Sequence, residues 1–139
     1  MTTMMNKLVI IVFMILAYSN LTHGEQFTCS VSSHTTTNDN GIHEASNAAH
    51  MLNWTFTLNV QTGEIQGGLA SNVRVPNRKV EIVEAGGVGK SITIVTTRGG
   101  SFNYLADLLV INTYVDSMNK PFDLFVSGFG LFSGLCKRL

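Results

Sequence analysis

The sequence has no excess of charge of either sign, because nine lysine and arginine residues are matched by nine aspartate and glutamate residues. Proteins that bind nucleic acid or an anionic membrane surface through electrostatics carry a basic patch or a clear positive excess. We therefore expect no nucleic-acid partner. The chain also has no internal repeat and no low-complexity linker, which favours one compact domain over an array.

Catalytic motifs are also scarce. The chain has no G-x-S-x-G motif of the kind that positions a serine nucleophile, and its carboxylates are scattered singly. Glu81 and Glu84, which are close in sequence, fall on opposite faces of one expected strand. We therefore expect no cofactor, and we favour a non-catalytic protein that binds a partner protein or a small apolar ligand. The alternative is a secreted hydrolase-type enzyme that uses the polar loop His34–His50.

That polar stretch contains three histidines, His34, His43 and His50. Imidazole is a common ligand of zinc and copper, so these three side chains are the candidate metal ligands. Their spacings of nine and seven residues match no compact ligand motif. The favoured interpretation is a long solvated loop, with one helical turn over Glu44–His50.

The longest hydrophobic run is short, covering residues 8–18 after the single basic residue Lys7. A helix that crosses a bilayer needs about 20 apolar residues, whereas a charged start, a short apolar run and small polar residues are typical of a secretory signal peptide. We expect residues 1–24 to be that signal peptide and residues 25–139 to form a single β domain. Cleavage after Ser19 is the alternative, and an uncleaved anchor is a lesser one. The protein is thus predicted to be exported, periplasmic or extracellular, without a stable membrane anchor after cleavage.

Only two cysteines are present, Cys29 and Cys136, near the two ends of the expected mature chain. Metal sites and redox motifs usually bring cysteines close together in sequence. In an exported chain, two distant cysteines are better explained by a structural disulfide. We therefore predict a disulfide that joins the first and last strands.

Most of the mature sequence consists of short strand-like runs separated by glycine-containing and polar turns. The clearest run covers residues 53–60, where Trp54, Phe56, Leu58 and Val60 alternate with polar residues. The other expected strands cover residues 27–31, 64–69, 79–85, 91–97, 102–105 with 108–115, 122–127 and 129–137. About seven or eight short strands predict an all-β antiparallel barrel or sandwich, stapled by one disulfide.

The segment Gly86–Ser91, with the sequence GGVGKS, is similar to part of a phosphate-binding loop. The full pattern requires a glycine where this chain has Glu84, whose carboxylate would repel phosphates. It also requires a following helix, whereas a β-branched run follows here. We therefore expect a hairpin turn.

The densest aromatic region lies near the C-terminus and contains Phe122, Phe125, Phe129 and Phe132. A strand that is apolar on both faces is either central in a sheet or borders a partner or ligand. Core packing is the favoured interpretation. Phe125, Phe129 and Phe132 are the candidate contacts for a partner protein or a small apolar ligand.

Three segments together resemble small exported bacterial proteins with an F-x-C start, a central strand that ends in T-G, and a P-F strand followed by a terminal G-x-C. They are Phe27–Cys29, Phe56–Gly63, and Lys120–Phe125 with Ser133–Cys136. The resemblance implies a bacterial periplasmic or secreted origin and an end-to-end disulfide. That group carries no assigned activity, so no functional residue is carried over. The S-G-x-x-Y loop of exported barrel inhibitors of lysozyme is absent here.

Overall fold

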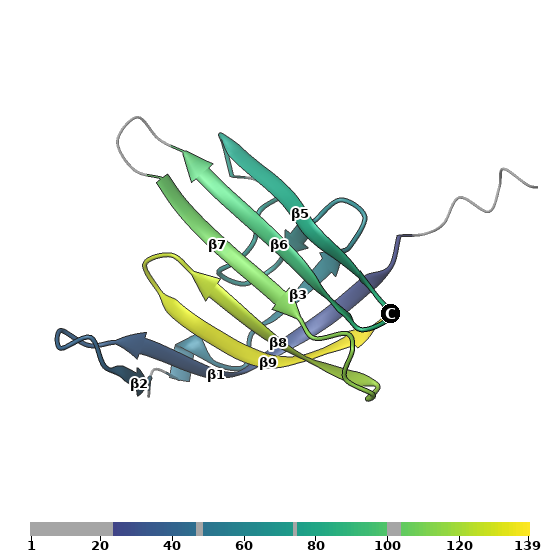
Figure 1. Ribbon diagram of the computed structural model, residues 1–139. Coiled ribbons are helices and arrows are strands. Elements are labelled where there is room, and N and C mark those ends of the chain that lie inside the picture. Colours follow the sequence, from purple (N-terminus) through teal and green to yellow (C-terminus); the bar gives the residue numbers. More distant parts are fainter. Residues whose placement is uncertain (1–23, 47–48, 74, 100–103) are drawn as a thin grey trace, which may run out of the picture.

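The computed structural model describes residues 24–46, 49–73, 75–99 and 104–139 (Figure 1). The predicted signal peptide lies outside these residues apart from Gly24. The described chain forms strands β1 Gln26–Thr37, β2 His43–Ala45, β3 Thr55–Asn59, β4 Glu64–Gln66, β5 Arg78–Gly87, β6 Lys90–Gly99, β7 Tyr104–Ile111, β8 Asn119–Val126 and β9 Gly130–Arg138, and the short 3-10 helix η1 Ala49–Met51.

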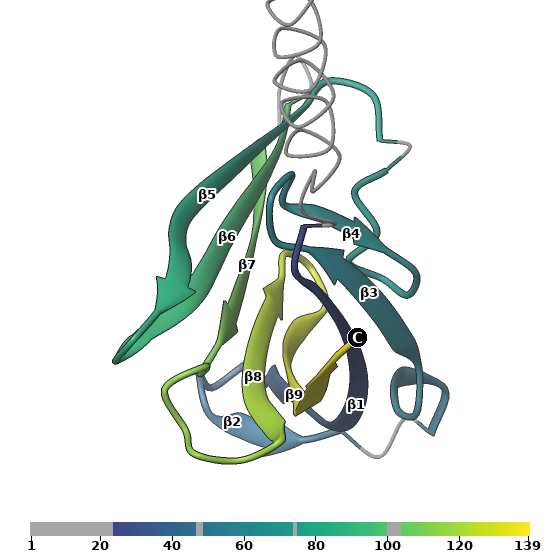
Figure 2. The ribbon, with the colours of Figure 1, turned by 90° about the vertical axis from the view of Figure 1, so that its right-hand side faces the viewer.

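Eight of the strands form one antiparallel sheet in the order β4-β3-β1-β9-β8-β7-β6-β5, and β2 pairs only with β1. The sheet curls into a nearly closed barrel (Figures 1 and 2). The predicted all-β antiparallel class is thus confirmed, and the architecture is a barrel. The glycine-rich segment at 86–91 is a hairpin turn between β5 and β6, as expected from the β-branched run that follows it.

The disulfide is formed as predicted, with an S–S distance of 1.95 Å between Cys29 and Cys136. The two residues lie directly opposite each other in the antiparallel pair β1–β9. The main-chain N–H of Leu139 donates to the carbonyl oxygen of Gln26 at 2.9 Å, so the two ends of the described domain lie side by side.

The inner face of the barrel is filled by aromatic and branched aliphatic side chains. The predicted alternation in residues 53–60 is confirmed, because Phe56, Leu58 and Val60 are buried and Trp54 packs against the same core. The Phe56 ring meets the Phe122 ring edge to face, with 5.3 Å between their centres. Inward-facing positions of a small barrel are expected to be filled in this way, so the middle of the barrel is packed.

The expectation of a long solvated loop over residues 34–50 is wrong at its start. Strand β1 continues to Thr37 and pairs with β2, leaving only a short turn over residues 38–42 between them. The expected helical turn is confined to η1. The strand continues because β9 pairs with it as far as Thr35, and this pairing satisfies backbone groups that a loop would leave to water.

The barrel has a seam between β4 and β5, where no backbone ladder joins the described strands. The turn between β3 and β4 packs against β5, because a Cβ atom at Gly63 would lie only 2.6 Å from Cγ1 of Val80. Gly63 also has a positive φ of 68°, a backbone conformation that glycine adopts without steric cost.

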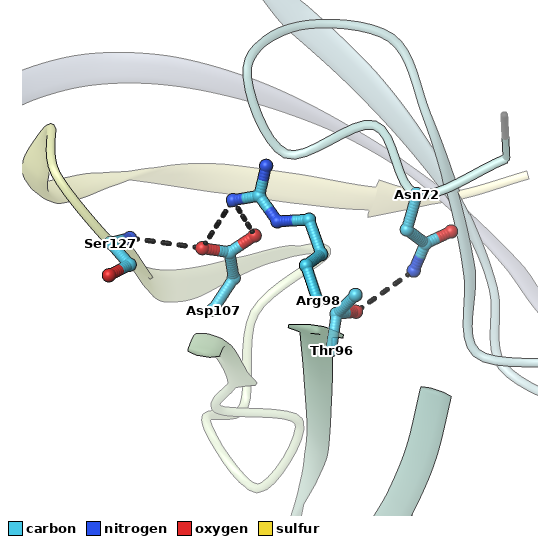
Figure 3. Close-up of polar contacts among 5 residues, drawn as sticks. All are labelled: Asn72, Thr96, Arg98, Asp107 and Ser127. Atoms are coloured by element: carbon cyan, nitrogen blue, oxygen red, sulfur yellow. Dashed lines mark hydrogen bonds and ion pairs between the residues drawn. The ribbon is translucent and has the colours of Figure 1, made fainter. Parts of the chain in front are cut away.

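The buried side chain of Asn72 bridges this seam (Figure 3). Its Oδ1 accepts the main-chain N–H of Ile65 in β4 at 2.8 Å and Nη1 of Arg78 in β5 at 3.0 Å. Its Nδ2 donates to the carbonyl of Gly63 at 3.0 Å and to Oγ1 of Thr96 in β6 at 3.1 Å. One amide therefore connects the two edge strands that the backbone leaves unpaired.

We expect Asn72→Ala to lower the free energy of unfolding by about 2–3 kcal/mol, because it leaves several buried polar groups without partners. Urea unfolding followed by tryptophan fluorescence measures the loss. Asn40→Ala, in the exposed turn between β1 and β2, is the matched control and should change stability by less than about 0.5 kcal/mol. Equal effects of the two substitutions would show that the seam does not depend on Asn72.

Candidate ligand pocket at one end of the barrel

A pocket of about 650 Å³ lies at the end of the barrel where β1 begins and β9 ends. Figure 2 looks toward the end of β9, with the β5–β6 hairpin on the left and the loop between β7 and β8 below it. The pocket is lined by residues from the start of β1, the β5–β6 turn, β6, the β7–β8 loop, the start of β8 and the end of β9.

The apolar part of the pocket has a buried base and an exposed rim. Phe27 of β1 and Ile92 of β6 belong to the barrel core and also line the pocket. Val88, at the tip of the β5–β6 turn, and Met118, in the β7–β8 loop, line the same pocket but are almost fully exposed. Exposed apolar side chains beside a pocket are a common feature of binding sites.

The polar part of the pocket is mainly cationic. Lys120, Lys137 and Arg138 line it, and Glu25 is the only carboxylate among its described lining residues. Arg138 forms an ion pair with Glu25, and its Nε donates to Glu25 Oε1 at 2.6 Å. Lys120 Nζ donates at 2.5 Å to the main-chain carbonyl of Val115, a neutral acceptor.

The position of Lys120 follows from the alternation of β8. Phe122, Leu124 and Val126 are buried residues on the inward face of the strand. Lys120 lies two residues before Phe122, on the same face and nearer the pocket. It lies opposite Cys136 in the β8–β9 pair, next to the disulfide. This strand therefore carries a cation at the inward position where the packed core ends.

A second polar cluster joins β6, β7 and the turn after β8, and here the charges are paired (Figure 3). Arg98 Nη2 donates to both carboxylate oxygens of Asp107, at 2.9 and 2.6 Å. Asp107 Oδ1 also accepts the main-chain N–H of Ser127 at 2.9 Å. The cluster fixes the β8–β9 turn to β7, and the charge of its carboxylate is already paired with Arg98.

The three candidate metal-ligand histidines are not brought together. His34 is only 4% exposed and stacks on Phe132, with 4.3 Å between ring centres. His43 lies in β2, where its Nδ1 is 3.3 Å from Oγ1 of Thr37, and His50 is exposed in η1. Within the described ranges, no group of three or more histidine, cysteine, aspartate or glutamate side chains is placed to hold a metal ion.

The ring of His34 also forms one hydrogen bond to the main chain. Its Nε2 lies 2.7 Å from the carbonyl oxygen of Phe129, and since a carbonyl only accepts, Nε2 carries the hydrogen. The other ring nitrogen, Nδ1, is buried without a hydrogen-bond partner among the described residues. His34 thus acts as a packing residue that connects β1 to the β8–β9 turn. The three histidines on which the enzyme alternative depends do not lie together.

The three candidate contact phenylalanines have different environments. Phe125 and Phe129 are 46% and 42% exposed, whereas Phe132 is fully buried in the core. Phe125 stands between Leu108 of β7 and Leu131 of β9 in a row of cross-strand neighbours on the outer face. A partner at the surface can therefore contact Phe125 and Phe129 but cannot reach Phe132.

No protein-family model matches the chain, and searches of curated proteins and of solved structures find no match. Among the described residues, no helix has the length and apolar character needed to cross a membrane.

Proposed function

We propose that the protein is an exported, non-catalytic binding protein that holds a small, largely apolar ligand in the pocket at the end of the barrel. The observation that carries the proposal is the combination of a buried apolar base with exposed Val88 and Met118 at the rim of one pocket. Its volume of about 650 Å³ falls within the range of small-molecule sites, roughly 300–1,000 Å³, and the mouths of β-barrels are a common location for them.

Export is supported by the disulfide and by the amino-terminal sequence. The Cys29–Cys136 bond is typical of a protein in an oxidising compartment. The charged, apolar and then polar arrangement of residues 1–24 matches a secretory signal peptide. Both observations favour a periplasmic or extracellular location.

The binding proposal is tested with N-phenyl-1-naphthylamine, a neutral apolar probe whose fluorescence rises in apolar surroundings. We expect saturable binding of one probe per protein. Met118→Glu should weaken binding about tenfold, because it places a carboxylate at the apolar rim and removes apolar contact area.

The matched control for that experiment is Ile42→Glu. Ile42 is an exposed apolar residue in the turn between β1 and β2, outside the pocket lining. It should leave probe binding unchanged. Absence of saturable binding, or equal weakening by the two substitutions, would contradict a ligand site at this end of the barrel.

The export proposal predicts that the mature protein begins at Glu25. When the full precursor is expressed in a bacterial host, the protein recovered from the periplasm or medium should have the mass of residues 25–139. Intact mass spectrometry and amino-terminal sequencing measure this. A recovered protein that retains residues 1–24 would contradict signal cleavage.

A further inference from the structure

We infer, on the basis of the proposed function, that the ligand is an amphiphile with one apolar chain and one anionic head group. The head group would meet the cations at the ends of β8 and β9, and the chain would lie against the apolar base. A carboxylate and a phosphate share the chemistry required, since both offer oxygen acceptors with negative charge.

Positive charge is concentrated at the pocket. The whole chain has equal numbers of acidic and basic residues, yet the pocket is lined by three cations and one carboxylate. Glu25 is already engaged by Arg138. Other acidic residues are engaged elsewhere: Glu84 pairs with Lys90, and Asp107 pairs with Arg98.

The two lysines that line the pocket have no carboxylate partner among the described residues. Lys120 is partly buried and its ammonium group donates only to a main-chain carbonyl, so its charge has no carboxylate partner among the described residues. Lys137 is exposed and also lines the pocket. An ammonium group beside apolar side chains is stabilised by an anion, and hydrogen bonds between ionised partners are stronger than neutral ones.

The other ligand classes fit the pocket less well. A cationic amphiphile would place like charges together at the Lys120 side of the pocket. A small inorganic anion would leave the apolar base and the exposed Val88 and Met118 without contacts. A neutral apolar molecule would fill the base but gain nothing from the cations. Only an anionic amphiphile uses both parts of the site.

The test compares four ligands with ten-carbon chains as competitors of bound N-phenyl-1-naphthylamine, each below its micelle concentration or, for the alcohol, below its solubility limit. They are decanoate, decyl phosphate, decanol and decyltrimethylammonium. We expect at least one of the two anions to displace the probe at a concentration about tenfold below that of decanol, and the cation to be the weakest. The tighter anion identifies the head group. Equal displacement by anion and cation would overturn the inference.

Variants of the two lysines test the residues themselves. Lys137→Met and Lys120→Met should each weaken binding of the tighter anion about tenfold while leaving decanol unchanged. The side chain of Lys137 forms no hydrogen bond or ion pair with another described residue, so its substitution keeps the test valid even if loss of the Lys120–Val115 contact shifts the loop. Lys79→Met, at an exposed position of β5 outside the pocket, is the matched control.

The two proposals fail in different ways. If the neutral probe and decanol bind and Met118→Glu weakens both, but head-group charge and the lysine variants have no effect, the ligand site stands and its anion preference is wrong. If none of the probe and the four ligands binds, the proposed function is wrong.

Discussion

Replacing both cysteines, as Cys29→Ala with Cys136→Ala, is expected to lower the free energy of unfolding by about 4–5 kcal/mol. The bond closes a loop of 107 residues, and in the chain-entropy model a loop of about 100 residues restricts the unfolded chain by that amount. This is a large share of the roughly 5–15 kcal/mol by which small domains are stable. Urea unfolding of the variant and the wild-type protein measures the difference.

Reduction of the wild-type protein is the control, because it breaks the same bond without changing either residue. Its unfolding curve should match that of the double variant within the small contribution of the two sulfur atoms. Before reduction, a thiol assay on the unfolded protein should detect no free thiol. Two titratable thiols, or a disulfide-linked dimer on a non-reducing gel, would contradict the intramolecular bond.

The second large effect is expected at Phe56, where Phe56→Ala should cost about 3–5 kcal/mol. The side chain is almost completely buried, and its loss leaves a cavity and removes an edge-to-face contact with Phe122. Thr55→Ala, the neighbouring exposed position on the opposite face of β3, is the control and should change stability by less than about 0.5 kcal/mol. A loss below about 1 kcal/mol for Phe56→Ala would show that this face does not form the core.

The strands and the disulfide could be predicted because their signals are local or leave few alternatives. Alternation over residues 53–60 assigns each side chain to a face without knowledge of any neighbour. The disulfide could be predicted because the chain has only two cysteines and an oxidising compartment favours their pairing. The choice of a barrel over a sandwich depends on how the sheet curves, and that information is spread over all eight strands.

The burial of His34 could not be predicted from its neighbours in the sequence. His34 lies in a run of polar residues, and nothing near it in sequence indicates burial. Its partner is Phe132, almost one hundred residues away, and the contact exists only because β9 pairs with β1. The same pairing places Phe132 in the core, although Phe125 and Phe129 are exposed.

The pocket could not be predicted from the sequence either, because its lining comes from six separate parts of the chain. One signal was present at Lys120. Extending the alternation of Phe122, Leu124 and Val126 back by one step puts a lysine on the inward face at the end of a strand. A cation at such a position indicates the mouth of a barrel, since the packed interior would exclude it.

The position of β9 between β1 and β8 has a consequence for the order in which the sheet assembles during folding. Strands β5 to β8 are neighbours both in the sequence and in the sheet, whereas β1, β3 and β4 form a separate group. Among the described strands, only β9 joins the two groups by backbone pairing. Pairings of long sequence separation form slowly, since a large loop must close first. Until β9 has paired on both sides, both groups expose apolar faces that later become one core, so this nine-residue strand is needed to make the barrel a single cooperative unit.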